Sequence, residues 1–349
     1  MSLVPKLKRR TYQFILFLRP VFYLAVISLI ILFFIWFIPK TKPLTKIFSL
    51  INPAITQLNS FRGRTNFLLL GIGGGDHPGA DLTDSIMFIS VNLTHSDTVL
   101  ISLPRDIWIE SLSAKINTAY EFGEAKQLGG GLVLAKSAVS EIINQPVHYA
   151  VLLDFSGFER AIDIVGGIDL NVLHGFTDPQ YPVPGKETAE PESSRYEALT
   201  FSPGQQHMDG SLALKYVRSR YSQGEEGSDY ARAQRQQLVL LAFKDKVLSP
   251  SVLLNPAKLK ALYQEFKHAV KTDLSTSSYI DLVKLVLRVK SSSLRTGIVD
   301  QGSSSEDIPA LLYNPPSSLY GQWVLLPVNN NWQSVYSYVS ELLYQNKTQ

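Results

Sequence analysis

The chain has 349 residues, no cysteine and a formal net charge of +3. Its first 60 residues carry eight basic side chains and no acidic one, so the remainder carries 25 basic and 30 acidic side chains. This mildly acidic remainder argues against nucleic-acid binding, which requires a basic face. The missing cysteine fits a bacterial domain outside the cytoplasm that folds without disulfides.

The N-terminal segment predicts a membrane anchor. Val21–Ile38 is a run of 18 uncharged residues interrupted only by Ser28, long enough to cross most of the hydrocarbon layer of a bilayer as a transmembrane helix. No small-residue cleavage site follows it, as a signal peptide would require. Five basic residues precede the run and three follow it, which predicts a single-pass protein of the cell membrane with residues 1–20 as its cytoplasmic tail. Residues 39–65 then form a juxtamembrane linker, and residues 66–349 form one extracytoplasmic domain.

The first half of this domain alternates strands with helices. Short apolar runs bounded by Gly, Asp or Pro are typical of strands buried on both faces, and apolar residues at helical spacing indicate the covering helices. We expect strands at residues 66–72, 84–92, 98–103, 147–154 and 168–172, and helices at residues 131–144 and 156–165. The alternation predicts an α/β layered fold in which a central sheet is covered on both sides.

The second half is mainly helical. Residues 176–204 are rich in Pro, Glu, Ser and Gly and predict a long loop. We expect helices at residues 209–220, 228–248, 256–270, 275–289 and 332–344, and a strand at residues 323–328. No linker divides the body, so we expect one domain.

A glycine cluster follows the first predicted strand. In Gly71–Asp76, the acidic residue stands where a dinucleotide fingerprint has its third glycine, no Gly-Lys-Ser/Thr occurs, and a strand follows instead of a helix. These features exclude the dinucleotide and P-loop motifs. The loop is either a tight turn or a place where a charged ligand approaches the backbone.

Carboxylates and an arginine gather at the strand ends. Asp76, Asp81 and Asp84 lie within nine residues, and clustered oxygen ligands suit Mg²⁺ shared with a phosphate, although Asp is also a common turn residue. Arg105 ends the third strand and reaches the same edge of the sheet if the intervening strand is antiparallel. It is either an anion clamp or the partner of Asp106 in a surface ion pair.

The densest group of polar residues surrounds the start of the helix expected at residues 228–248. Arg232 and Gln236 follow Asp229 at i+3 and i+7 and therefore share one helix face. Arg218 and Arg220 precede it; being two apart, they face one site only if the chain leaves helical geometry there. Guanidinium forks bind phosphate oxygens, so these arginines opposite acidic ligands describe a metal-assisted phosphoryl-transfer site, although a solvated helix face is the simpler alternative. Motifs of cysteine, serine and zinc hydrolases are absent.

These motifs, taken in order, resemble the LytR-CpsA-Psr family. They are TDS (83–85), SLPRD (102–106), KIN-x-AY (115–120), GF followed by VGGID (157–169), DGSLALKYVRSR and SDYARAQRQQ. The resemblance is strong over residues 66–248. It implies an α/β/α domain with a central mixed sheet and an apolar channel for a lipid. It also implies transfer of a glycopolymer from a polyprenyl pyrophosphate carrier to the cell wall, generally peptidoglycan, with Mg²⁺ assistance.

The resemblance assigns roles to matching residues. Asp84 matches the family's metal-ligand aspartate, and the phosphate-contacting positions are Arg105, Arg218, Arg220, Arg232 and Gln236. Of these residues, Asp84, Arg105, Arg218 and Arg220 are the predicted catalytic set.

Two positions depart from the family pattern. The arginine of the first motif is Leu82, and Gly73 stands where an earlier aspartate is usual. Asp76 is therefore the expected second metal ligand, with Asp81 as the second choice. Two alternatives stay open: hydrolysis of the same lipid pyrophosphate, and a non-catalytic scaffold that binds envelope glycans.

Overall fold

The computed structural model describes most of the predicted extracytoplasmic part. The described residues are 58–74, 79–94, 97–183, 185–186, 188–289, 294–302 and 309–345. The predicted tail, the predicted transmembrane helix at Val21–Ile38 and most of the predicted linker lie outside them. Within the described ranges, no helix combines the length and the apolar character needed to cross a membrane.

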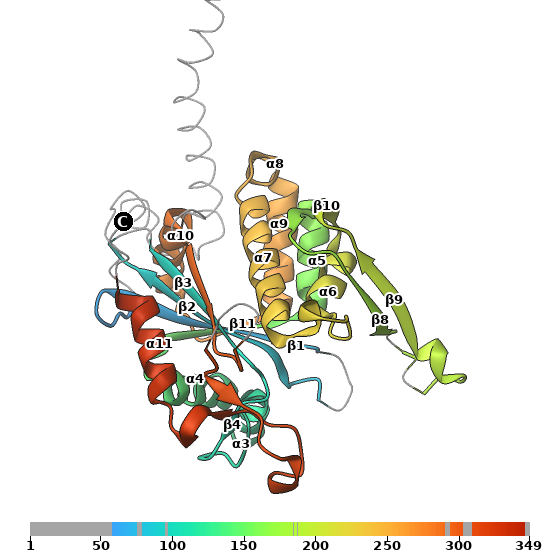
Figure 1. The fold of residues 1–349 in the computed structure, drawn as a ribbon. Helices are drawn as coiled ribbons and strands as arrows, with labels where there is room; N and C mark the ends of the chain where they lie inside the picture. The colour runs from blue at the N-terminus through green and yellow to red at the C-terminus, as the bar shows by residue number, and fades with distance from the viewer. Residues whose placement is uncertain are drawn as a thin grey trace, which may run out of the picture.

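A six-stranded mixed sheet forms the centre of the fold, with the strand order β11-β6-β1-β2-β3-β12 (Figure 1). The strands are β1 (Arg64–Ile72), β2 (Thr83–Asn92), β3 (Thr98–Leu103), β6 (Tyr149–Asp154), β11 (Val270–Thr272) and β12 (Leu294–Ile298). β1, β2 and β3 are successively antiparallel, whereas β6 runs parallel to β1 and β12 parallel to β3. The predicted α/β fold with a central mixed sheet is confirmed.

Helices cover both faces of the sheet (Figure 1). One face carries α3 (Ala119–Lys126), α4 (Gly130–Ile143) and α11 (Gln333–Tyr344), and the other carries α5 (Phe155–Val165), α6 (Gly210–Arg218), α7 (Asp229–Val247), α9 (Pro256–Ala269) and α10 (Tyr279–Arg288). On the first face, Leu70, Phe88 and Ile101 of three neighbouring strands pack with Ile142 of α4 and Val339 of α11. Because strand side chains alternate, the next residues face the other layer. There, Gln237 of α7 donates a hydrogen bond to Ser102 Oγ at 2.9 Å.

A second core lies within the α5–α6–α7 layer, where Ile162, Met208, Ala213 and Val239 are buried. Two antiparallel strand pairs extend from it: β7 (Ile168–Val172) with β10 (Gly204–Met208), and the hairpin of β8 (Phe176–Pro182) with β9 (Tyr196–Phe201). The prediction of a long loop over residues 176–204 is therefore wrong. In β8, buried and exposed residues alternate, but prolines and polar residues on the exposed side obscured that alternation.

Other differences concern shorter elements. The helix α3 and the two edge strands of the central sheet, β11 and β12, were not predicted, and the strand expected at residues 323–328 is reduced to a two-residue strand. Short elements complete the fold: β4 (Trp108–Ile109), β5 (Ala114–Lys115), α8 (Pro250–Leu253), β13 (Leu312–Tyr313) and β14 (Leu326–Pro327). α3 has Gly123 in its middle, and β12 is defined by its pairing with β3, so neither has a strong local pattern.

An ion-pair network ties three strands together at the sheet end where β1 begins. Arg64 at the start of β1 is buried, and its Nη1 lies 2.5 Å from Asp97 Oδ2. Arg295 of β12 donates to both oxygens of Asp97 at 2.7 Å. Burial acts to raise the pKa of Asp97, but hydrogen bonds from Arg295 and Arg64 outweigh burial, so the pKa lies below its ordinary value.

We predict that Asp97→Asn lowers the free energy of unfolding by about 2–3 kcal/mol at pH 7, because it leaves the buried guanidinium of Arg64 without its counter-charge. The pKa of Asp97 is lowered in the fold, so the carboxylate stabilises fully above its unfolded pKa of about 3.9 and progressively less below it. The difference between variant and wild type, measured by urea denaturation, should shrink as the pH falls below about 4. Glu190→Gln, which breaks an exposed pair with Arg195, is the control and should cost below about 0.5 kcal/mol. Equal costs for the two variants would contradict the assignment.

Candidate active site

The start of β2 and the end of β3 lie side by side at one end of the sheet. Asp84 is the second residue of β2, and Arg105 follows β3 by two residues. Arg105 Nη1 donates a hydrogen bond to Asp84 Oδ1, and the side chains of Arg105 and Asp84 are 27% and 34% exposed. Since the two strands are antiparallel, the predicted proximity of Asp84 and Arg105 is confirmed by this contact.

The backbone around this pair is held by the segment that precedes α3. The hydroxyl of Thr83 donates to Asn117 O at 3.2 Å, and Asn117 N donates to Arg105 O at 3.3 Å. Lys115 Nζ lies 2.7 Å from Asp106 Oδ1, and Arg105 Nε lies 3.6 Å from Asp106 Oδ2. Arg105 thus lies between the carboxylates of Asp84 and Asp106. These contacts fix the position of its guanidinium at the end of the sheet where β2 begins and β3 ends.

The glycine loop after β1 packs closely against the start of α5. A Cβ at Gly71 would meet the ring of Phe155 at 2.4 Å, and a Cβ at Gly74 would meet a carboxylate oxygen of Asp154 at 2.2 Å. Gly74 also has a φ of +67°, a left-handed conformation that favours glycine. Asp154 caps α5 by accepting a hydrogen bond from Ser156 N at 2.7 Å. These contacts bring the end of β1 and the first residues of the loop against the start of α5.

The other two predicted metal ligands have different outcomes. Asp76 lies outside the described residues, so its role stays a prediction. Asp81 is exposed, and its negative charge acts on Tyr120 and Lys271, whose Nζ donates to the Tyr120 hydroxyl at 3.1 Å. Burial raises the pKa of the Tyr120 hydroxyl, and the charge of Asp81 acts in the same direction. Leu82, where the resembled family has arginine, adds no charge here.

The arginines after α6 lie where the helix ends. Arg218 is the last residue of α6, and Ser219 has an extended ψ of 131°. Arg218 is exposed and Arg220 is half-buried. The chain leaves helical geometry between them, which is the condition under which both arginines can face one site.

A buried carboxylate that was not predicted holds this segment. Asp178 of β8 is fully buried. Its Oδ2 accepts hydrogen bonds from the Ser219 hydroxyl at 2.5 Å, from Arg220 N at 3.0 Å and from Tyr221 N at 3.2 Å. Burial acts to raise the pKa of Asp178, but these bonds and one from Gln180 N outweigh it and hold the pKa below its ordinary value. The charged carboxylate thus fixes the backbone on which Arg220 sits.

Helix α7 connects the segment that carries Arg218 and Arg220 to the end of the sheet where β2 begins. Ser228 caps the helix by accepting a hydrogen bond from Ala231 N at 3.1 Å. The hydroxyl of Ser85, the residue after Asp84 in the chain, donates to Gln236 Oε1 at 3.1 Å. Arg232 lies about one turn before Gln236 on the same face and is 9% exposed. One helix face therefore reaches the strand that carries the acidic group.

Arg235, the fourth arginine of this region, has a structural position. Its guanidinium is buried and donates to Tyr216 O at 3.1 Å, to Ser219 O at 2.8 Å and to Glu226 Oε2 at 2.9 Å. It also stacks over the ring of Phe176, 4.6 Å from the ring centroid. Arg235 thus joins α7 to the end of α6. Its guanidinium N–H groups are used in these hydrogen bonds.

The described residues offer limited support for a metal site. Among them, no three His, Asp or Glu side chains are grouped closely enough to hold a metal ion. Mg²⁺ bound to a substrate phosphate usually needs only one or two protein carboxylates. Asp84 accepts one hydrogen bond from Arg105, and a carboxylate has about four lone-pair sites, so Asp84 fits the requirement for one such ligand.

We predict that Asp178→Asn weakens the binding of inorganic pyrophosphate about tenfold, because the segment carrying Arg218 and Arg220 loses the charged acceptor that fixes it. Stability should also fall, by about 1–2 kcal/mol. Asp209→Ala removes the N-cap at the other end of α6 and should cost a similar stability with little change in pyrophosphate affinity. Isothermal titration of both variants distinguishes positioning from general destabilisation. Equal affinities for the two variants would contradict the positioning role.

Comparison with known proteins agrees with this geometry. The model of the LytR_cpsA_psr family matches residues 45–309. A curated relative, the polyisoprenyl-teichoic acid–peptidoglycan teichoic acid transferase TagU of Enterococcus faecalis, is 29% identical over 69% of this chain and 73% of its own length. The protein of the same name from Oceanobacillus iheyensis is 29% identical over 63% of this chain. That match spans 62% of the relative, less than two thirds of its length.

Solved structures show the same fold. The crystal structure of TagV from B. subtilis has a TM-score of 0.55 at 22% identity, covering 82% of this chain and all of that one. The crystal structure of B. subtilis TagT has a TM-score of 0.54 at 22% identity, covering 83% of this chain and 95% of that one. Because the family model matches about three quarters of the chain, and the described motifs lie within that match, the chain belongs to the LytR_cpsA_psr family.

Proposed function

We propose that this protein transfers a glycopolymer phosphate from a polyprenyl pyrophosphate carrier to a cell-wall acceptor, peptidoglycan. The observation that carries the proposal is the contact between Ser85 and Gln236, which brings the helix that bears Arg232 to the strand residue next to Asp84. The curated relatives bear the name of teichoic acid transferases that act on peptidoglycan. Family membership and site geometry support the same chemistry.

The arginines bind the pyrophosphate in this proposal. Arg105, Arg218, Arg220 and Arg232 neutralise its charge, and Gln236 contacts a phosphate oxygen. Guanidinium forks hold two phosphate oxygens at once, so they also orient the phosphorus for attack. Such positioning and charge stabilisation supply most of the catalysis in phosphoryl transfer.

The bond changes follow from this placement. The acceptor hydroxyl oxygen attacks the phosphorus that carries the glycan, and the bond from that phosphorus to the bridging oxygen breaks. Polyprenyl phosphate leaves, and the proton of the acceptor hydroxyl passes to a carboxylate, for which Asp84 is the described candidate. Asp84 would also hold Mg²⁺, with Asp76 as the predicted second ligand; the ion would supply positive charge to the pyrophosphate oxygens.

Two other functions use the same surface. In the first, water replaces the acceptor hydroxyl and the protein is a lipid-pyrophosphate hydrolase. In the second, the protein binds envelope glycans without catalysis. Free phosphorylated glycan as the main product would favour hydrolysis, and retained glycan binding without any turnover would favour a scaffold.

We predict that Arg218→Ala lowers transfer from a defined lipid-linked donor at least about a hundredfold, because one fork on the pyrophosphate is lost. Arg218→Lys should restore only part of the rate, since an ammonium cannot form the bidentate contact. Arg160→Ala, which removes an exposed arginine paired with Glu265, is the matched control and should leave the rate unchanged. Unchanged transfer by a folded Arg218→Ala protein would rule out the proposed site. Equal rates with and without Mg²⁺ in this assay would rule out the metal.

The anchor extends the proposal to the membrane. A donor whose pyrophosphate lies at the bilayer surface cannot leave it, so a helix at residues 21–38 would keep the arginines beside the substrate. A variant lacking residues 1–38 should act normally on short-chain donors in solution but lose efficiency on donors embedded in vesicles. Equal loss, or no loss, on both donors would contradict the role of the anchor.

A further inference from the structure

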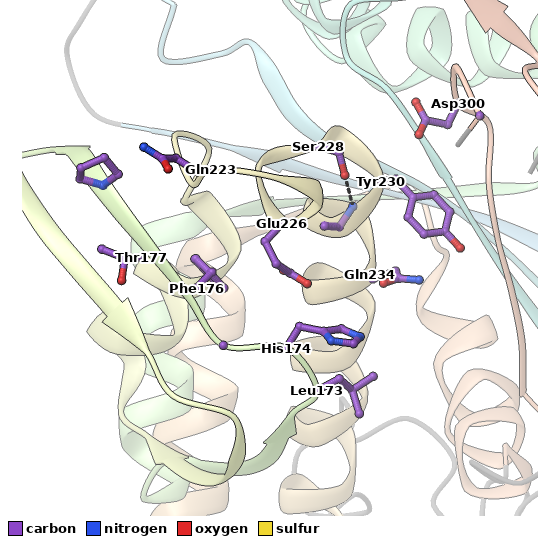
Figure 2. Close-up of a pocket in the computed structure, with 14 residues that line it drawn as sticks. Leu173, His174, Phe176, Thr177, Gln223, Glu226, Ser228, Tyr230, Gln234 and Asp300 are labelled. Carbon is purple, nitrogen blue, oxygen red and sulfur yellow. Dashed lines mark hydrogen bonds between the residues drawn. The ribbon is translucent and has the colours of Figure 1, made fainter. Parts of the chain in front are cut away.

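A large cleft lies on the side of α7 that faces away from the predicted phosphate site. It has a volume of about 940 Å³ and is bordered by the turn between β7 and β8, by the start of α7 and by the segment after β12. Figure 2 shows Glu226, Gln234 and His174 around one space, with Tyr230 beside Gln234 on α7 and Asp300 across from them. None of the predicted phosphate-binding or metal-binding residues lines it.

The position of the cleft follows from helix geometry. Gln234 lies two residues from both Arg232 and Gln236, which is about 200° around an α-helix. One side of the first turns of α7 therefore carries the cationic and amide groups of the phosphate site. The opposite side carries Tyr230 and Gln234.

The side chains that line the cleft favour an uncharged ligand. The described residues around the cleft include no lysine or arginine, but they include the carboxylates of Glu226 and Asp300. The polar lining is otherwise composed of amides, hydroxyls and an imidazole: Thr177, His174, Gln223, Gln234, Ser228 and Tyr230. Such groups pair with the hydroxyl and acetamido groups of uncharged sugars, and the face of a ring such as Tyr230 suits the apolar face of a sugar.

The shape of the cleft suits a linear polymer. A second pocket of about 280 Å³ shares Tyr230, Gln234 and Asp300 with the first and continues to the end of β12 and to Tyr338. The two spaces together form a groove along α7 that is open to solvent beside Leu173, which is 68% exposed. A linear polymer fits such a groove better than a single compact ligand does.

The wall of the cleft is bonded to the arginine segment. Glu226, whose side chain borders the cleft, accepts a hydrogen bond from Arg235 Nη1 at 2.9 Å. Arg235 Nη2 in turn donates to Ser219 O at 2.8 Å, between Arg218 and Arg220 in the chain. A ligand in the cleft is therefore held at a fixed position relative to the phosphate-binding arginines.

The geometry points to this cleft as the binding site for the acceptor, an uncharged glycan strand of N-acetylated sugars, on the side of α7 opposite the donor pyrophosphate. This inference rests on the proposed transfer reaction for the direction of the chemistry. The absence of cations among the described lining residues separates the two substrates: an anionic donor polymer finds no counter-charge there, and a neutral acceptor needs none.

The test uses the full chain in lipid nanodiscs and a peptidoglycan-derived tetrasaccharide whose carboxyl groups are amidated. Binding is measured by calorimetry without donor, and transfer is measured with a lipid-linked donor. Gln234→Ala and His174→Ala should each raise the Kd of the tetrasaccharide about tenfold. Both variants should raise KM for the acceptor more than they change the affinity for inorganic pyrophosphate. Gln205→Ala replaces an exposed glutamine on β10 that does not line the cleft; this variant is the matched control and should match wild type.

Each result has a defined reading. Absence of saturable tetrasaccharide binding to wild type at millimolar concentration, or an unchanged Kd in both cleft variants, would overturn the inference. So would competition for the cleft by a soluble polyol phosphate polymer. If the tetrasaccharide binds as expected but no transfer product forms from any donor, the proposed function fails and the cleft stands as a glycan site, so the two failures are distinguishable.

Discussion

Asp178, a buried carboxylate on β8, accepts three hydrogen bonds from the segment that follows α6. This interaction determines where the chain stops being helical and therefore where Arg218 and Arg220 are carried. Several arginines placed together repel one another, so a segment that carries them requires fixed backbone anchors and nearby negative charge. Asp178 supplies both from a hairpin that is remote in sequence. Arg235 supports the same segment from the other side through its bond to Ser219 O.

Helix α7 separates two chemically different surfaces. One face presents Arg232 and Gln236 towards the strand that carries Asp84, and the opposite face lines a cleft without lysine or arginine among its described residues. A transferase needs its two substrates close together but bound by different interactions. A helix that is cationic on one side and neutral to acidic on the other meets that requirement with a single rigid element, because residues about half a turn apart face opposite directions.

The reliability of the sequence predictions followed the strength of the local patterns. The strand at residues 98–103 and the strand at residues 168–172 were predicted with the bounds that the structure has, because each is a compact apolar or alternating run. The hairpin of β8 and β9 was missed because the residues on its exposed face are of types that are common in loops. The edge strand β12 has little pattern of its own and forms because β3 offers an unpaired edge.

The sequence by itself determined the family motifs, the α/β layering and the types of side chain available for phosphate binding, because these are encoded in short stretches. It did not determine which of those side chains meet. The contact of Ser85 with Gln236 joins residues 151 positions apart, and that of Asp178 with Ser219 joins residues 41 positions apart. Arg218 ends α6 and Arg235 lies in α7, close to each other in the chain. Only the folded chain could decide that Arg235 is buried and hydrogen-bonded within the protein while Arg218 is exposed. Burial and long-range pairing depend on how distant elements pack, and no local pattern carries that information.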